Sequence, residues 1–289
     1  MNEPIAVPTS AAPAVDGWTP KLVALDIDGT LLIPDFATGI SADHVSPAVQ
    51  SAIDAIVAAG VPIVLASGRS PMSMTRVADL IGLTAPGIPR LHIVSSNGAV
   101  VVRYPPMELI HERTFDASAA VRLVMEHRPG VAVAVEQHGV GFRVNRHFPP
   151  GELDGDITVT DLDELIGDHV SRVIIRDPDA TNDDFVALAH RLGLQGTNYY
   201  IGYTAWLDIA PEGVSKAEGL QWVVDRMGID AADVLAIGDG NNDIEMLAWA
   251  GRGVAMGHAP ADVKAAANDV TLPVEQDGAA VELRRWFPR

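Results

Sequence analysis

The sequence predicts an α/β protein with a parallel-sheet core, helices on both faces of that sheet, and a smaller α+β unit inserted into it. Short apolar runs alternate with helical segments over residues 21–98 and again from residue 211. Between these parts, apolar runs come in pairs separated by turn residues, which is typical of antiparallel hairpins. Two core runs, beginning at Leu22 and Val234, end in acidic clusters.

Composition limits the classes of function. The chain has 289 residues, of which 48% are hydrophobic and 20% charged, as in soluble globular proteins of one large or two ordinary domains. Its net charge of −18 argues against nucleic acid or an anionic membrane as a partner. A small anionic substrate stays possible where a metal ion and basic groups reverse the charge locally. The absence of cysteine excludes disulfides, thiolate zinc sites and thiol nucleophiles.

The first twenty residues are rich in alanine and proline and lack a basic region followed by a continuous apolar segment. This pattern predicts a flexible tail over residues 1–20 and not a secretory signal. No apolar run approaches the ~20 residues that span a bilayer. We therefore expect a cytoplasmic protein. The sequence gives no indication of its oligomeric state.

The first core segment, residues 21–98, alternates strands and helices. A helix over Pro47–Ala59 has apolar residues on one face and stops at Gly60, and a second begins at Ser70-Pro71 with a cap and a proline. Residues 29–46 contain proline and glycine and predict a loop or small flap. Strands are expected at Leu22–Asp26, Val61–Ala66 and Leu91–Ser95. This order implies a parallel sheet.

The insert is expected over residues 99–210, about one hundred residues and thus of ordinary domain size. Its helices are predicted at 117–127 and 181–192, and its strands at 99–103, 108–111, 131–135, 141–144, 170–175, 199–203 and 206–210. The core resumes over 211–289. There we expect helices at 215–227 and 244–250 and strands at 234–238 and 253–256.

The first acidic cluster is Asp26-Ile27-Asp28, followed by Gly29. Strand alternation sends Ile27 to the side opposite the two acids, and Gly29 permits the chain to turn after Asp28. One carboxylate can then act as a nucleophile and the other as a general acid and base. The alternative is an ordinary β-turn after a strand.

Two further segments predict anion binding. Ser67-Gly68-Arg69 lies between a strand and a helix N-terminus, where a hydroxyl and a backbone amide bind phosphate oxygens well. The alternative is an ordinary connection between a strand and a helix that binds nothing. Lys216 starts a helix, where the dipole disfavours a cation, so its position hints at an anionic partner. The alternative is a solvated surface lysine.

The second acidic cluster contains Asp239 and Asp243, four residues apart across a turn at Gly240. Both can approach one cation from a loop that leads into a helix; the alternative is a helix cap with an extra acid. Carboxylates gathered at the carboxyl ends of parallel strands cannot all ionise comfortably unless a cation joins them. Together with Asp26 and Asp28, these residues predict a metal site built from distant segments.

Taken in order, these motifs identify a family. The sequence resembles the haloacid dehalogenase-like hydrolases, and among them the Cof-type phosphatases with a large α+β cap of the C2B type. The resemblance covers Lys21 to Leu283. His258 departs from it, because the family usually has asparagine there. The matching motifs are Asp26–Thr30, Ser67–Arg69, Ser96–Ala99, Gly213–Lys216, Gly238–Asp243, Ala255–Gly257 and Gln276–Gly278.

The resemblance implies a Rossmann-like core over 21–98 and 211–289 and a cap over 99–210. It implies that Asp26 attacks phosphorus and that Asp28 protonates the leaving alcohol and then activates water. It also implies Mg²⁺ held by the Asp26 carboxylate, the Asp28 carbonyl and Asp239, with Asp243 orienting waters and Lys216 neutralising charge. The residues expected around the phosphate are Ser67, Gly68, Arg69, Asn97 and Asn242.

The implied substrates are small phosphorylated metabolites, often sugar phosphates. The cap residues that could contact the leaving group are Glu136, His138, Arg143, Tyr199, Tyr200, Tyr203 and Trp206, each equally open to a structural role. Three other functions compete. A phosphohexomutase of the same superfamily would return an isomer, a receiver-type signalling module would stay phosphorylated on aspartate, and a glycosyltransferase would use Asp-x-Asp to hold a metal–nucleotide.

Overall fold

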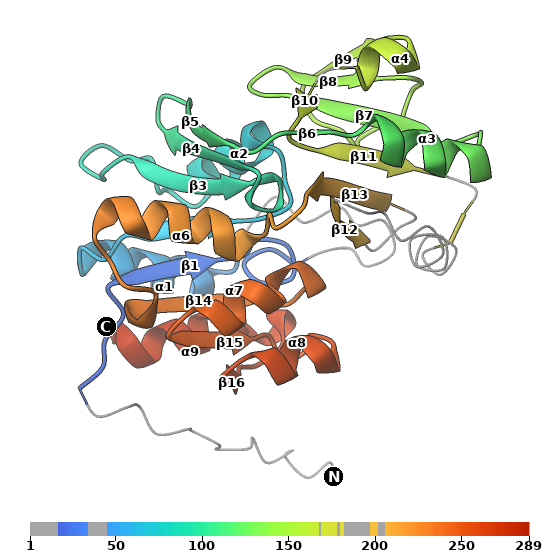
Figure 1. Ribbon diagram of the computed structural model, residues 1–289. Helices are drawn as coiled ribbons and strands as arrows, with labels where there is room; N and C mark the ends of the chain where they lie inside the picture. The colour runs from blue at the N-terminus through green and yellow to red at the C-terminus, as the bar shows by residue number, and fades with distance from the viewer. Residues whose placement is uncertain are drawn as a thin grey trace.

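The computed structural model describes residues 17–33, 45–167, 169–177, 180–181, 197–201 and 206–288, with the backbone alone for 197–201. Within these residues the chain forms an eight-stranded sheet, a six-stranded sheet and a small two-stranded sheet. The two larger sheets lie in separate parts of the molecule (Figure 1). The predicted α/β fold is confirmed.

The eight-stranded core sheet has the order β16-β15-β14-β1-β2-β3-β4-β5. Neighbours from β16 to β3 pair in parallel, whereas β4 and β5 are antiparallel. The strands are β1 (Leu22–Leu25), β2 (Ile63–Ala66), β3 (Leu91–Ser95), β4 (Val100–Tyr104), β5 (Glu108–Glu112), β14 (Val234–Gly238), β15 (Arg252–Ala255) and β16 (Asp269–Val270). The helices are α1 (Pro47–Ala58), α2 (Pro71–Leu80), α6 (Lys216–Met227), α7 (Ile244–Trp249), α8 (Ala261–Ala266) and α9 (Gly278–Trp286).

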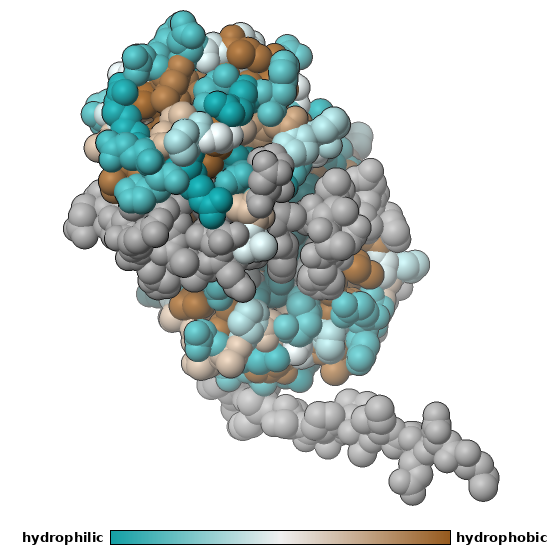
Figure 2. Space-filling view, turned by 90° about the vertical axis from the view of Figure 1, so that its right-hand side faces the viewer, coloured by the Kyte–Doolittle hydropathy of each residue, from teal (hydrophilic) through white to brown (hydrophobic). Residues whose placement is uncertain are grey.

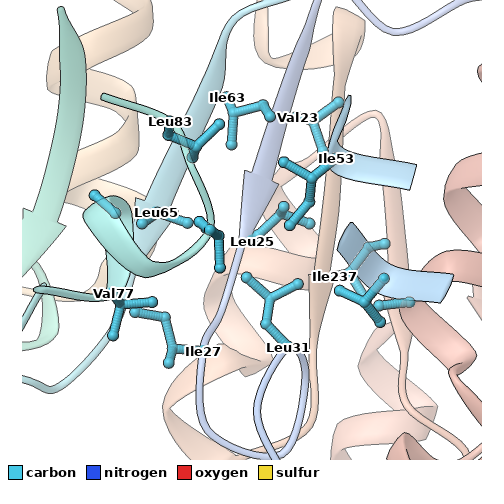
Figure 3. Packing of buried hydrophobic residues seen from close by; sticks show 14 of the residues in the cluster. Val23, Leu25, Ile27, Leu31, Ile53, Ile63, Leu65, Val77, Leu83 and Ile237 are labelled. Atoms are coloured by element: carbon cyan, nitrogen blue, oxygen red, sulfur yellow. The ribbon is translucent and has the colours of Figure 1, made fainter. Parts of the chain in front are cut away.

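Helices cover both faces of the core sheet, and this explains the continuous apolar runs in its strands. In β1, Val23 and Leu25 pack toward α1, α2 and α9, whereas Leu22 and Ala24 pack toward α6, α7 and α8. Figure 3 shows the first of these clusters, in which Leu25 lies among side chains from the neighbouring strands and helices. All four residues of β1 are completely buried. Polar residues at the strand ends are therefore held by a rigid, closely packed frame.

The six-stranded cap sheet has the order β12-β13-β11-β7-β8-β9. Its strands are β7 (Ala132–Gln137), β8 (Gly141–Val144), β9 (Asp156–Val159), β11 (Val173–Arg176), β12 (Thr197–Ile201) and β13 (Trp206–Pro211). One face packs against α3 (Ser118–His127) and α4 (Leu162–Leu165). The opposite face carries a small apolar cluster around Phe142 and Ile174. A two-stranded sheet of β6 (Phe115–Asp116) and β10 (His169–Val170) lies beside it.

The strand pairing corrects one assignment made from the sequence. The strands predicted over 99–103 and 108–111 were placed in the insert that begins at residue 99, but they form β4 and β5 of the core sheet. The four residues between β3 and β4 are too few for a crossover, so the next strand returns antiparallel beside β3. The strand predicted over 170–175 is split between β10 and β11. The helix predicted over 181–192 lies almost entirely outside the described residues.

The described part of the predicted tail is attached to the core. The indole Nε1 of Trp18 donates to the carbonyl of Ala232 at 2.9 Å, and its ring meets that of Trp286 edge to face at 4.7 Å. The first 16 residues lie outside the described part of the chain. On the face in Figure 2, hydrophilic side chains predominate and hydrophobic ones are scattered among them. Among the described helices, none has the length and apolar character needed to cross a membrane.

We predict that Trp18→Ala lowers the free energy of unfolding by about 1–3 kcal/mol, because it removes a partly buried ring and a hydrogen bond. Urea denaturation measures the change. Trp18→Phe keeps the ring contact with Trp286 and loses only the donor, so its loss is expected to be smaller. Equal stability of the wild type and Trp18→Ala would show that this contact does not hold residues 17–20 to the core.

Candidate active site

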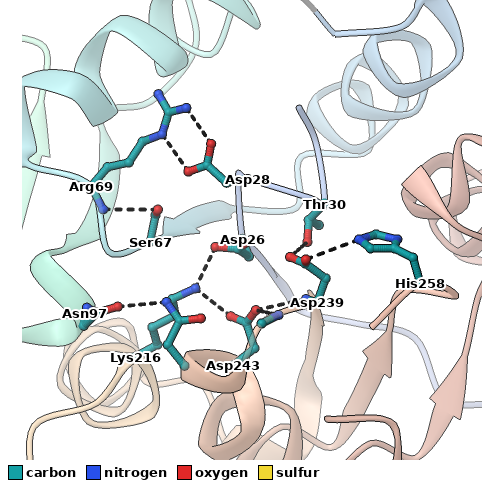
Figure 4. Close-up of polar contacts among 12 residues, drawn as sticks. Asp26, Asp28, Thr30, Ser67, Arg69, Asn97, Lys216, Asp239, Asp243 and His258 are labelled. Carbon is teal, nitrogen blue, oxygen red and sulfur yellow. Dashed lines mark hydrogen bonds and ion pairs between the residues drawn. The ribbon is translucent and has the colours of Figure 1, made fainter. Parts of the chain in front are cut away.

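The candidate site lies at the carboxyl ends of the central core strands. Asp26 directly follows β1, Ser67 follows β2 and Asp239 follows β14. The register Leu25↔Ile237 and the hydrogen bond from the Asp26 amide to the Ile237 carbonyl bring the first and last of these ends together. Figure 4 shows their side chains converging with that of Lys216.

Three buried carboxylates form the centre of the site. One oxygen from each of Asp26, Asp239 and Asp243 lies within 4.8 Å of the others. Thr30 supports this cluster by donating its hydroxyl to Asp239 Oδ1 at 3.4 Å. Gly29 has φ +82°, and a Cβ there would lie 2.2 Å from Asp239 Oδ2, so only glycine allows the turn to approach so closely. The expected meeting of acids from both ends of the chain is confirmed.

Lys216 is buried among these acids. Its side chain is 1% exposed, and its ammonium group donates to Asp26 Oδ1 and to Asp243 Oδ1, each at 2.6 Å. Burial alone would lower the pKa of Lys216, but the charges of Asp243 and Asp26 raise it above its ordinary value. The alternative of a solvated surface lysine is therefore wrong. The anionic partner suggested by its place in the helix includes the protein's own carboxylates.

The cluster holds more negative than positive charge. Burial and then the charge of Asp243 raise the pKa of Asp26 well above its usual value, and burial raises that of Asp243. Asp243 Oδ2 accepts hydrogen bonds from the amides of Asp239 and Gly240, both at 2.9 Å. A divalent cation would balance the excess charge, and an all-oxygen donor set suits Mg²⁺. The residues present thus fit the expected ion.

Asp28 has a different environment from Asp26. Its carboxylate accepts two hydrogen bonds from the guanidinium of Arg69, from Nε at 2.7 Å and from Nη2 at 2.6 Å. Arg69 also donates to Ser73 Oγ at 3.2 Å. Burial alone would lower the pKa of Arg69, but the hydrogen bond to Asp28 and the charge of Asp28 raise it above its ordinary value. Arg69, expected at the phosphate, binds Asp28 in this structure, and no local pattern in the sequence indicates this pairing.

The remaining residues expected at the phosphate lie together. Asn242 donates from Nδ2 to Asn97 Oδ1 at 2.9 Å. A Cβ on Gly68 would lie 2.9 Å from the same Asn97 oxygen, so the amide packs directly on that glycine. The Ser67 hydroxyl accepts from the Arg69 amide at 3.3 Å. Ser67 and Asn97, which follow β2 and β3, lie to the left of the acidic residues in Figure 4.

His258, the residue that departs from the family pattern, contacts the centre of the site. The amide of Val274 donates to its Nδ1 at 3.3 Å, and its Nε2 lies 3.2 Å from Asp239 Oδ2. Because Nδ1 accepts a hydrogen bond, Nε2 carries the proton and donates to Asp239. His258 and Thr30 therefore bind opposite oxygens of one carboxylate. Sequence reasoning did not assign either of them a role at Asp239.

Of the cap residues considered for substrate contact, Glu136 and His138 lie 3.5 Å apart, whereas Arg143 and Trp206 have other neighbours. Glu136 accepts from the Ser96 hydroxyl at 2.8 Å, and His138 Nε2 lies 2.8 Å from Glu112. Arg143 lies on β8 opposite Val135, and Trp206 packs edge to face on Phe148 within the cap. The side chains of Tyr199 and Tyr200, and all of Tyr203, lie outside the described residues.

Comparisons with known proteins agree on one family. The model of the haloacid dehalogenase-like hydrolases matches residues 23–283. The 5-amino-6-(5-phospho-D-ribitylamino)uracil phosphatase YitU of Bacillus subtilis is 30% identical over 285 residues, which cover 93% of this chain and 98% of that protein. The HMP-PP phosphatase of Cronobacter sakazakii is 29% identical and covers 83% of this chain and 85% of its own. A solved haloacid dehalogenase-like hydrolase from Bacteroides thetaiotaomicron has a TM-score of 0.73 at 25% identity, over 93% of this chain and all of its own.

We predict that Lys216→Met lowers the free energy of unfolding by about 3–5 kcal/mol, because it leaves buried carboxylates without a countercharge. Urea denaturation in the presence of a chelator measures this loss. Adding Asp243→Asn to Lys216→Met is expected to recover part of the stability. Lys264→Met on α8, outside the site, serves as the control. An unchanged stability of Lys216→Met would contradict the charge balance described above.

Proposed function

Because the chain belongs to the haloacid dehalogenase-like hydrolase family, we propose that it hydrolyses small phosphorylated metabolites through an aspartyl phosphate, with Mg²⁺ as its cofactor. The protein is a phosphoric monoester hydrolase of the Cof type. The observation that carries the proposal is the meeting of three buried carboxylates with Lys216 at the carboxyl ends of parallel strands.

Asp26 is the proposed nucleophile. An oxygen of its carboxylate bonds to phosphorus while the bond from phosphorus to the ester oxygen breaks, which produces an aspartyl phosphate and an alkoxide. Lys216 lies 2.6 Å from that carboxylate and offsets the charge, so that one anion can approach another. Attack by water then releases inorganic phosphate and restores the Asp26 carboxylate.

Asp28 is the proposed general acid and base. It gives a proton to the departing alkoxide and later takes one from the water that attacks the aspartyl phosphate. Its side chain is 28% exposed, whereas that of Asp26 is 6% exposed. This greater exposure supports the proposal, because a leaving group and water would reach Asp28 more easily than Asp26.

The Asp26 and Asp239 carboxylates and the Asp28 carbonyl are proposed to hold Mg²⁺, and Asp243 to orient the waters that complete its shell. When bound, the ion would supply positive charge to the phosphoryl oxygens. Ser67, the Gly68 amide and Asn242 are proposed to hold the remaining oxygens, with Asn97 positioning Asn242. Arg69 is proposed to reach the substrate from its place beside Asp28.

The proposed substrates carry a hydroxylated leaving group, as sugar and polyol phosphates do. The similar protein YitU is named for a substrate with a phosphorylated ribityl chain. On the cap, Arg172 donates to Asp208 at 2.8 and 3.1 Å, and its Nη1 lies 3.9 Å from Glu136. Carboxylates and guanidinium groups hydrogen bond readily to hydroxyls, and this chemistry supports a leaving group that carries hydroxyls.

The competing functions make different products. A phosphohexomutase would convert a hexose phosphate to its isomer, a signalling module would accumulate the phosphorylated protein, and a glycosyltransferase would bind nucleotide sugars. No observation in the described residues favours any of these over hydrolysis. The cytoplasmic location and the exclusion of nucleic-acid partners stay predictions from the sequence.

We predict that Asp26→Asn and Asp26→Ala each reduce phosphate release by more than about a thousandfold, because the covalent route is lost. A panel of phosphate monoesters, assayed for inorganic phosphate with and without Mg²⁺, measures the rate. Circular dichroism checks that the variants are folded, and product analysis separates hydrolysis from isomerisation. Turnover retained in either variant would remove Asp26 as the nucleophile.

We also predict that Mg²⁺ stabilises the wild type by about 2.7 kcal/mol when the free ion is a hundredfold above its dissociation constant. Thermal unfolding with increasing Mg²⁺ measures this independently of turnover. Asp239→Asn is expected to lose most of the effect. Asp233→Asn, which lies just before the opposite end of β14, is expected to keep it. A wild type whose unfolding is insensitive to Mg²⁺ would count against the metal site.

A further inference from the structure

The turn between β3 and β4, residues Ser96 to Gly98, connects the candidate site to the cap. All three residues have positive φ, at +50°, +54° and +102°. The left-handed region is unfavourable for serine, although asparagine adopts it more readily, and two such residues in succession persist only where their surroundings fix them. The neighbours of this turn therefore decide where its side chains lie.

The backbone of the turn is fixed by two motifs of the site. The Ser96 amide donates to the Arg69 carbonyl at 2.9 Å, and the Asn97 amide to the Ser67 carbonyl at 3.1 Å. A Cβ on Gly98 would lie 1.9 Å from the Ser215 carbonyl oxygen, so only glycine fits there. Ser215 caps the helix that begins with Lys216. The turn is thus packed between the segments that carry Ser67 and Lys216.

The side chains of the turn point to different partners. Asn97 accepts from Asn242 in the core, whereas the Ser96 hydroxyl donates to Glu136 Oε2 of β7 at 2.8 Å. Ser96 is 1% exposed and the Glu136 side chain 2%. A hydrogen bond to a carboxylate shielded from water is strong and sensitive to geometry. A displacement of β7 would therefore act on Ser96 and on the adjoining Asn97.

We propose that Ser96 is a positioning residue through which the cap, by way of Glu136, sets the Asn97–Asn242 pair at the phosphate-binding end of the core. The proposal rests on the proposed function, because it describes how the cap controls that same site. Since coupling between sites is reciprocal, phosphate held by Asn242 also favours the seated cap. A cap that is loosened at Glu136 weakens phosphate binding in the core.

Another contact between the cap segment and the core supplies a control. Arg76 of α2 binds Asp154 at 2.9 Å, but both side chains are exposed, at 62% and 40%. This pair contributes little to stability and has no hydrogen bond to the turn. Asp154→Asn therefore removes an ion pair between the cap and the core without touching the proposed route through Ser96.

The experiment compares four variants of the full chain with the wild type. Ser96→Ala and Ser96→Gly both delete the hydroxyl, and glycine also relieves the positive φ. Glu136→Gln keeps an acceptor for Ser96, and Asp154→Asn is the control. Hydrogen–deuterium exchange without ligand is measured over residues 96–99 and 240–243. Inhibition by inorganic phosphate and the separate values of kcat and KM are measured with p-nitrophenyl phosphate and Mg²⁺.

Ser96→Ala and Ser96→Gly are expected to accelerate exchange in both segments and to raise the inhibition constant of phosphate by about tenfold. They should raise KM more than they lower kcat. Glu136→Gln keeps an acceptor but loses the charge, so it should shift exchange and the inhibition constant of phosphate in the same direction as Ser96→Ala but by less, and Asp154→Asn should match the wild type.

The proposal is overturned if Asp154→Asn behaves like Ser96→Ala, because general loosening of the cap would then be the cause. It is also overturned if Ser96→Gly behaves like the wild type, or if exchange over 240–243 does not change. A wild type that releases no phosphate would refute the proposed function, whereas the exchange measurements would still decide the coupling.

Discussion

The burial of Lys216 between Asp26 and Asp243 is the interaction on which the rest of the site depends. Moving an ammonium group and carboxylates out of water is costly, and only close mutual contact offsets that cost. Both contacts of Lys216 measure 2.6 Å, and its partner Asp26 is 190 residues away in the chain. A core that failed to bring these segments together would leave a charge buried without a partner. Folding and assembly of the site are therefore the same event.

The parallel sheet fixes the positions of the acids in this cluster. The pairing of β1 with β14 continues one residue beyond β1, because the Asp26 amide still donates to Ile237. Both acids thus leave the sheet at the same edge before the chain becomes irregular. The turn after β1 then passes so close to Asp239 that Gly29 has no room for a side chain. Asp26 is held by strand pairing, and Asp239 by Thr30 and His258.

Much of this arrangement follows from local patterns in the sequence. Apolar runs located the core strands to within a residue or two, except for the short edge strand β16, since strands buried on both faces must be apolar throughout. Asp26 and Asp239 were found because each directly follows such a run. The hairpin of β4 and β5 was placed in the insert, because an alternating pattern does not tell which sheet a hairpin joins.

Side-chain pairing across the fold was much less predictable. The sequence placed Lys216 at the start of a helix but gave no means of identifying the carboxylates that surround it. The contacts of His258 and Thr30 with Asp239 likewise join segments that are distant in the chain. The hydrogen bond from Arg69 to Asp28 also joins distant segments, because the two residues follow neighbouring strands. Such contacts depend on the register and curvature of the sheet, and these arise only in the folded chain.

The turn at Gly29 also explains how two identical acids can have different roles. Asp26 lies among other carboxylates, away from water, where burial and the charge of Asp243 raise its pKa. Asp28, two residues later, lies at the edge of the site with its carboxylate on the guanidinium of Arg69. Lys216 holds the Asp26 carboxylate at 2.6 Å inside the cluster, whereas the Asp28 side chain is the more exposed of the two, at 28% against 6%. The division of labour proposed for Asp26 and Asp28 thus follows from where the chain turns, because the side chains themselves are chemically the same.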